Sequence, residues 1–139
     1  MSSTMHIWIA IAALAGAAIS SQLTPATARA DLHNITYKAR VDGVAPGSQA
    51  TFVTNVNQTN AAALSSMPGS AFEANAVLAD PNQAGMQVSV RWPYAANVHC
   101  EIDVDDNVVA QVDHFVQPAA GSSDPMNGVL PCGAPLPNP

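Results

Sequence analysis

Apolar and polar residues alternate with a period of two along much of the chain. From Ile35 to Val41, and again from Val98 to Val104, every second residue is apolar and the residues between are polar. This period is typical of β-strands with one buried face. Segments rich in Gly, Pro, Asp and Asn separate the alternating stretches and indicate turns. The pattern predicts strands over residues 35–41, 49–57, 71–79, 86–92, 98–104 and 108–116, with a further short apolar segment at 129–132.

No long segment keeps a helical period. Residues 58–70 are small and polar, and they predict a loop with one helical turn at Ala61–Leu64. In the strand over 86–92, the alternation places Met86 and Trp92 on the same inward face. Short strands with regular turns predict an all-β fold, an antiparallel, immunoglobulin-like β-sandwich of about seven strands.

The N-terminal segment has the features of an export signal. Ile7–Ile19 is an uninterrupted apolar run of thirteen residues, shorter than the ~20 that span a membrane. Ala28, Arg29 and Ala30 then match the A-x-A cleavage pattern. We expect residues 1–30 to be a cleaved signal peptide, residues 31–132 the β-sandwich, and residues 133–139 a Pro-rich C-terminal tail. A retained N-terminal anchor is the alternative, because no Lys or Arg precedes the apolar run.

Charge and cysteine content narrow the partners and the location. After residue 30 the chain has three basic residues, Lys38, Arg40 and Arg91, against ten acidic ones. An acidic surface without a basic cluster does not favour nucleic acid as a partner. Cys100 and Cys132 are the two cysteines, and in an exported protein they predict one disulfide, with free thiols as the alternative. The expected location is secreted, in the periplasm or the cell wall, and nothing indicates a cofactor.

The segment DVDDN, which starts at Asp103, resembles the start of an EF-hand calcium loop. Such a loop requires Gly at position six and Glu at position twelve. Those positions hold Val108 and His114, so the segment is not an EF-hand, and we expect no metal site. Asp105, Asp106 and Asn107 instead predict a three-residue hairpin turn with Asn107 in the left-handed conformation.

This turn predicts a strand register. Val104 would face Val108, and Ile102 would face Ala110, with Cys100 opposite Val112 farther along the hairpin. A slip of one residue would turn every apolar side chain to the other face.

On the outer face of the same hairpin, His99 would lie opposite Asp113. A further strand would place Arg91 beside His99. A general base needs a nucleophile within reach and a site that excludes water, and an open sheet face supplies neither. We therefore expect a cross-strand charge ladder, no catalytic residue and no enzymatic activity.

Three segments together resemble a known family. HCEIDVDDNVV (99–109), ITYKARVDG (35–43) and QATFVTNVN (49–57) are similar to segments of the MmpS proteins of mycobacteria, over about residues 35–132. The resemblance implies a β-sandwich with a Cys100–Cys132 disulfide and Asp105 and Asp106 in a hairpin turn. It also implies a role as a small accessory partner of MmpL transporters of the RND superfamily, which export lipids and siderophores. The family has a membrane helix where this chain has a cleavable segment, so we expect a secreted MmpS-like domain.

Two alternative functions remain open at this stage. A soluble extracytoplasmic carrier would hold an apolar ligand between the sheets, in space left by small core residues: Ala39, Ala50, Ala74, Ala76 and Ala110. A secreted protein with a purely protein-binding role is the other alternative. The expected partners are an MmpL-type transporter or another envelope protein, or a lipid or siderophore. The sequence does not identify ligand-binding residues.

Overall fold

The computed structural model describes residues 31–65, 67 and 70–137. The predicted signal peptide and its cleavage site after Ala30 lie outside these residues. Within them, no helix is long and apolar enough to cross a membrane. The elements are β1 (His33–Asp42), β2 (Gln49–Asn55), β3 (Gln58–Ala63), β4 (Phe72–Leu78), the 3-10 helix η3 (Pro81–Gln83), β5 (Gly85–Ser89), β6 (Ala96–Val104), β7 (Asn107–Val116) and β8 (Val129–Gly133).

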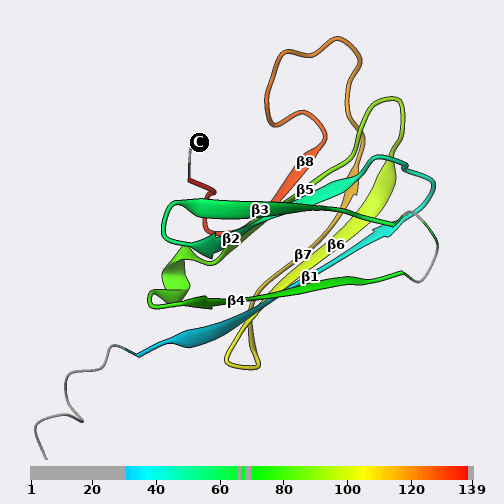
Figure 1. Cartoon of the computed structure of the whole chain (residues 1–139). Coiled ribbons are helices and arrows are strands. Elements are labelled where there is room, and N and C mark those ends of the chain that lie inside the picture. The colour runs from blue at the N-terminus through cyan, green and yellow to red at the C-terminus, as the bar shows by residue number, and fades with distance from the viewer. Residues whose placement is uncertain (1–30, 66, 68–69, 138–139) are drawn as a thin grey trace, which may run out of the picture. The chain divides into compact units, whose positions relative to one another are not determined.

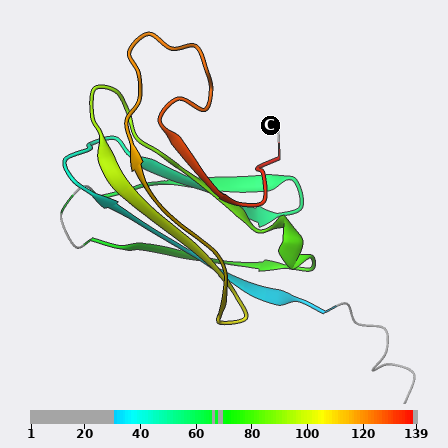
Figure 2. The same ribbon diagram turned by 180° about the vertical axis from the view of Figure 1, so that it is seen from behind.

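The eight strands form two four-stranded antiparallel sheets. Sheet A has the order β4-β1-β6-β7, and sheet B has the order β3-β2-β5-β8. Figures 1 and 2 show the two sheets from opposite sides. The predicted all-β antiparallel sandwich is confirmed, with eight strands where about seven were expected.

The inward faces of the two sheets form the core. On β1, Ile35, Tyr37, Ala39 and Val41 are all at most 2% exposed, which follows from the period of two in the sequence. The ring of Phe52 on β2 lies 5.3 Å from the ring of Tyr37, measured between centroids. Aromatic contacts of this kind add to the free energy gained by burying apolar surface.

The predicted loop at 58–70, with its helical turn at Ala61–Leu64, is wrong over its first half. Residues 58–63 form β3, which pairs with β2 so that Ala62 lies opposite Ala50 and Ala61 opposite Thr51. Alanine has a high helix propensity, but pairing with a neighbouring strand overrides a weak local preference.

The strand expected over 86–92 is shorter than predicted. Met86 and Val88 are buried as the alternation predicts, but β5 ends at Ser89. The backbone N–H of Tyr94 donates to the carbonyl of Arg91 and closes a turn. Trp92 is therefore 59% exposed instead of inward, and its outward position matters for the site described below.

The C-terminal segment belongs to the sandwich up to Gly133, one residue beyond the predicted boundary. β8 pairs with β5, and the backbone N–H of Ala134 donates to the carbonyl of Ala84. Leu136, within the predicted tail, packs against the core. The segment 134–137 therefore lies against the domain and adds no strand.

Candidate functional site

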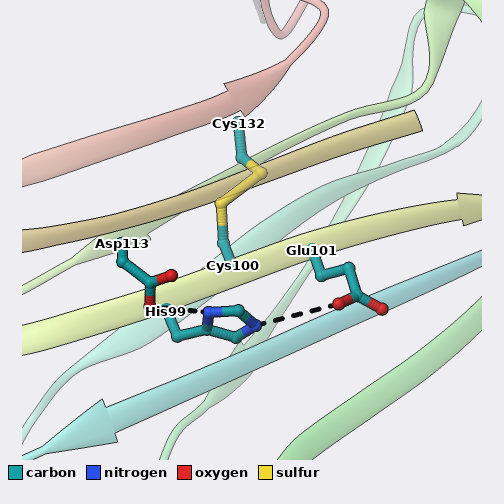
Figure 3. The surroundings of a disulfide bond; sticks show 5 residues. All are labelled: His99, Cys100, Glu101, Asp113 and Cys132. Carbon is teal, nitrogen blue, oxygen red and sulfur yellow. Dashed lines mark hydrogen bonds and ion pairs between the residues drawn. A yellow bond between two sulfur atoms is a disulfide. The ribbon is translucent and has the colours of Figure 1, made fainter. Parts of the chain in front are cut away.

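The predicted disulfide is present, and it joins the two sheets. Cys100 lies on β6 of sheet A and Cys132 on β8 of sheet B, with their Cα atoms 6.5 Å apart (Figure 3). Both residues are at most 2% exposed. Disulfides form mainly in oxidising compartments, so this bond fits an extracytoplasmic location.

The turn between β6 and β7 is tighter than the three-residue loop expected. Asp105 and Asp106 have φ values of 49° and 67°, and Asn107 already pairs with Val104 as the first residue of β7. The predicted left-handed conformation of Asn107 is wrong, because the two aspartates adopt it. A two-residue turn with two positive φ angles matches the right-handed twist of the flanking strands.

The register beyond the turn follows the sequence pattern. Ile102 lies opposite Ala110 and Cys100 opposite Val112, as predicted. The prediction that Val104 faces Val108 is wrong, since Val108 pairs with Asp103. A register shift next to Ile102 compensates for the shorter turn, so the inward face of β6 is preserved.

Asp105 also ties the turn to the start of β1. Its carboxylate accepts a hydrogen bond from the backbone N–H of Asn34 at 2.9 Å and lies 2.7 Å from the Nδ1 atom of His33. The hydrogen bond with His33 and the one from the Asn34 backbone lower the pKa of Asp105. The carboxylate thus anchors the hairpin to β1. Among the described residues, no group of three or more His, Cys, Asp or Glu side chains is placed so that it could hold a metal ion.

The outer face of sheet A carries a row of charged side chains. His99 Nδ1 lies 2.7 Å from Asp113 Oδ1, and His99 Nε2 lies 3.9 Å from Glu101 Oε1 (Figure 3). The prediction that Arg91 lies beside His99 is wrong. The strand next to β6 is β1, and its Arg40 lies opposite His99. The reason is that β5 and β6, although consecutive, belong to different sheets.

Lys38 continues this row on β1. Its Nζ atom lies 3.0 Å from Asp103 and 3.4 Å from Glu101, and hydrogen bonds to these two carboxylates raise the pKa of Lys38. Asp103 is only 8% exposed, and its Oδ1 atom has no hydrogen-bond partner. The row is a cross-strand ion-pair network of the kind that fixes the pairing of neighbouring strands.

The chemistry available to His99 is limited by its neighbours. The side chains that bond to it are carboxylates, and both cysteines are joined in the disulfide. A nucleophile activated by a base requires a hydroxyl or thiol within hydrogen-bond reach. The arrangement of His99, Glu101 and Asp113 therefore supports a structural role.

The sequence pattern did not predict a second candidate site, an exposed aromatic cluster at one end of the sandwich. The loops after β1 and after β5 lie at the same end of the sandwich, and Arg91, Trp92 and Tyr94 surround an open hollow of about 390 Å³ together with Pro46 and Gly47. We call these five residues the aromatic end. Trp92 is 59% and Tyr94 37% exposed. The signal in the sequence is the segment RWPY, where Pro93 makes a continued central strand unfavourable.

Arg91 differs from Lys38 and Arg40 in its ion pairing. Lys38 and Arg40 form ion pairs with carboxylates, whereas Arg91 forms none within the described residues. Gly47 makes room for Arg91: a Cβ atom at this position would approach the Cδ atom of Arg91 to 2.8 Å. The aromatic end thus presents an available guanidinium beside an exposed indole.

Comparisons of the chain with protein-family models, with curated proteins and with solved structures found no match. The likeness to the MmpS proteins therefore rests on the three sequence segments quoted above.

Proposed function

We propose that this protein is a secreted, non-enzymatic binding module of the mycobacterial cell envelope. It would assist an MmpL-type transporter in lipid or siderophore export, as the likeness to the MmpS proteins implies. The proposal rests on the aromatic end, where Arg91, Trp92 and Tyr94 are exposed together. Trp, Tyr and Arg are the residue types that contribute most to the binding energy of protein interfaces.

The position of the aromatic end suits a docking role. It lies where β1 ends and β6 begins, so Asp105 and the start of β1 lie at the opposite end of the sandwich. Arg91 is the one charged residue among the five that form the aromatic end, and Asp42, at the nearby end of β1, is already paired with Arg40. A partner with an apolar surface and a carboxylate complements the aromatic end, since a guanidinium binds carboxylates in a forked geometry.

The carrier alternative receives less support. Two grooves lie between the edges of the two sheets: one, lined by Ala39, Leu64 and Phe72 among others, has a volume of about 190 Å³, and the other, lined by Val104, Ala110 and Gly133 among others, has a volume of about 300 Å³. Sites for small-molecule ligands have volumes of roughly 300–1,000 Å³, so the larger groove only reaches the lower limit for ligand sites. Tyr37 and Met86 fill the space between the sheets, so the small alanines permit close packing.

Site-specific photocrosslinking in producing cells tests the proposal. A photoreactive residue replaces Val44, which is 76% exposed in the loop that also contributes Pro46 and Gly47. The matched control replaces Val109, which is 58% exposed on β7. We expect an adduct with an MmpL-type protein from position 44 that weakens when Trp92→Ala is added, and no such adduct from position 109.

Two results would contradict the proposal. Equal adducts from both positions would show that the aromatic end has no special role. Adducts with a lipid or siderophore, and no protein adduct, would favour the carrier alternative.

The predicted leader has its own test: the intact mass of the exported protein is expected to correspond to a chain that begins at Asp31.

A further inference from the structure

The outer face of sheet B is polar but carries no charge within its strands. The four strands of sheet B contain no Asp, Glu, Lys or Arg, whereas every charged residue within a strand belongs to sheet A. Because Ala50 and Val88 are 0% exposed, the residues that flank them face outward: Gln49, Thr51, Gln87 and Ser89. Amide and hydroxyl side chains both donate and accept hydrogen bonds. This face therefore matches a ligand rich in hydroxyl groups.

A hollow of about 390 Å³ lies at one end of this face, next to the aromatic end. Its lining consists of Ser48, Gln49, Ala63 and Ser89, together with Gly47 and Arg91, which it shares with the aromatic end. Gln49 pairs with both Ala63 and Ser89, so three neighbouring strands, β3, β2 and β5, form the floor (Figure 1). We call these six residues the sheet B hollow. Its volume lies within the roughly 300–1,000 Å³ of small-molecule sites.

The segments around the sheet B hollow are held in place by hydrogen bonds. The hydroxyl of Ser48 donates to the carbonyl of Ala45 at 2.8 Å, and the backbone N–H of Leu64 donates to the carbonyl of Ser48 at 2.9 Å. After β5, the backbone N–H of Val90 donates to the carbonyl of Gly128 at 2.8 Å. A site that is already ordered before binding loses less conformational entropy when its ligand binds.

Arg91 lies between the sheet B hollow and the aromatic end, since it lines both. Its side chain passes over Gly47, where a Cβ atom would approach its Cδ atom to 2.8 Å and its Nη1 atom to 3.4 Å. A guanidinium without an ion pair binds a carboxylate through two parallel hydrogen bonds. The chain has a net charge of −6, so it repels a ligand with many carboxylates. A ligand with one carboxylate, placed at Arg91, fits both observations.

The aromatic side chains beyond Arg91 favour a sugar ring over a peptide. Trp92 is 59% and Tyr94 37% exposed, and the electron-rich face of an aromatic ring attracts the C–H groups on the less polar face of a sugar. A peptide that adds a strand needs a sheet edge with unpaired backbone groups. The central strands β2 and β5 are paired on both sides, so they offer a ligand their side chains and no such edge.

We propose that the sheet B hollow binds a saccharide that carries a single carboxylate. The carboxylate accepts hydrogen bonds from Arg91, a sugar ring stacks on Trp92, and hydroxyl groups of a neighbouring sugar bond to Gln49 and Ser89. This binding is additional to the docking of a transporter. Gln49 and Ser89 lie outside the aromatic end, and saccharide binding requires no second protein.

An NMR titration of the exported chain tests this site. The probe is a xylo-oligosaccharide that carries one glucuronic acid, and the control ligand is the same oligosaccharide without the acid. We expect the acidic probe to bind with a dissociation constant of about 0.1–1 mM, as suits an open site, and to shift the signals of Gln49, Ser89 and the Trp92 indole. The neutral oligosaccharide should bind roughly tenfold more weakly, because it lacks the charge-assisted hydrogen bonds to Arg91.

Gln49→Ala and Gln111→Ala are the matched variants. Gln49 lines the hollow, whereas Gln111 is exposed on β7 of sheet A. We expect Gln49→Ala to weaken binding of the acidic probe about threefold or more, because one hydrogen bond is lost, and Gln111→Ala to leave binding unchanged. The spectrum of each variant shows whether it is folded.

Four results would overturn the saccharide site. They are no binding of the acidic probe up to about 10 mM, equal affinity for both oligosaccharides, equal effects of the two variants, and tighter binding of a peptide with a free C-terminal carboxylate. Failure of the docking proposal gives a different pattern: the transporter adduct from position 44 is absent while the acidic probe still binds at Gln49.

Discussion

The phenolic hydroxyl of Tyr37 donates a 2.7 Å hydrogen bond to the backbone carbonyl of Val53 and so joins sheet A to sheet B. Tyr37 is 0% exposed. A buried hydroxyl without a partner is costly, so the bond allows a large aromatic side chain to occupy the centre of the core. It also fixes where β1 lies over β2.

Tyr37→Phe removes this hydrogen bond and leaves the rest of the ring in place. We expect the free energy of unfolding to fall by about 1–2 kcal/mol. Urea denaturation followed by far-UV circular dichroism measures the change. Tyr94→Phe, at the exposed aromatic end, is the control and is expected to have no effect beyond ~0.5 kcal/mol. Equal effects of the two substitutions would be inconsistent with a bond between the sheets.

Alkaline pH is expected to destabilise the fold through the same residue. Burial raises the pKa of Tyr37 to about 12 from 10.0. The folded state therefore holds this proton more tightly than the unfolded state, so the stabilisation is complete below pH 10 and is lost as the pH rises toward 12. We expect a loss of roughly 2 kcal/mol over this window that is absent in Tyr37→Phe. The same loss in both proteins would assign it to other groups.

Removal of the disulfide is expected to destabilise the protein strongly. The bond closes a loop between Cys100 and Cys132, which are 32 residues apart. The chain-entropy model gives a contribution of roughly 3–4 kcal/mol for such a loop. Denaturation of a variant with both cysteines replaced by alanine measures this contribution. A reducing agent is the independent control: it should destabilise the original chain by a similar amount and leave the variant unchanged.

At turn position 106, glycine is expected to give a more stable protein than aspartate, and valine a less stable one. Its φ of 67° costs an ordinary side chain roughly 1–2 kcal/mol, and a glycine far less. Asp106→Gly should therefore raise the free energy of unfolding and Asp106→Val should lower it. Gln111, an exposed residue of the extended strand β7, provides the control because the order should reverse there. The same order at both positions would argue against the left-handed turn.

Asp105 is expected to contribute an acid-sensitive stabilisation. Its pKa is lowered by the hydrogen bonds with His33 and Asn34. Because the pKa is lower in the folded state, the ionised carboxylate stabilises the protein at pH values above the ordinary carboxyl pKa. This stabilisation is lost as the pH falls through the folded-state pKa. We expect Asp105→Asn to lower the melting temperature at pH 6 and to have a progressively smaller effect as the pH falls. Asp106→Asn is the control, and a matching pH dependence there would exclude the specific role of Asp105.

Several parts of the fold follow from local sequence alone. The inward positions of Ile35, Tyr37, Cys100 and Ile102 follow from the period of two, since a strand alternates its side chains between two faces. The register of Ile102 with Ala110 follows in turn from the need to keep these faces apolar. The length of the turn does not follow from the sequence. A two-residue loop with a register shift and a three-residue loop without one both place Ile102 opposite Ala110.

Side-chain alternation correctly predicted the buried faces of β1 and β6, and the two cysteines correctly predicted the disulfide. The sequence pattern did not predict that β5 and β6 belong to different sheets, that Arg40 and not Arg91 lies opposite His99, or that Trp92 is exposed. Nor did it predict that Gln58–Ala63 forms an edge strand. The physical reason is that side-chain alternation is a local property, whereas the pairing of strands depends on contacts between residues far apart in the chain.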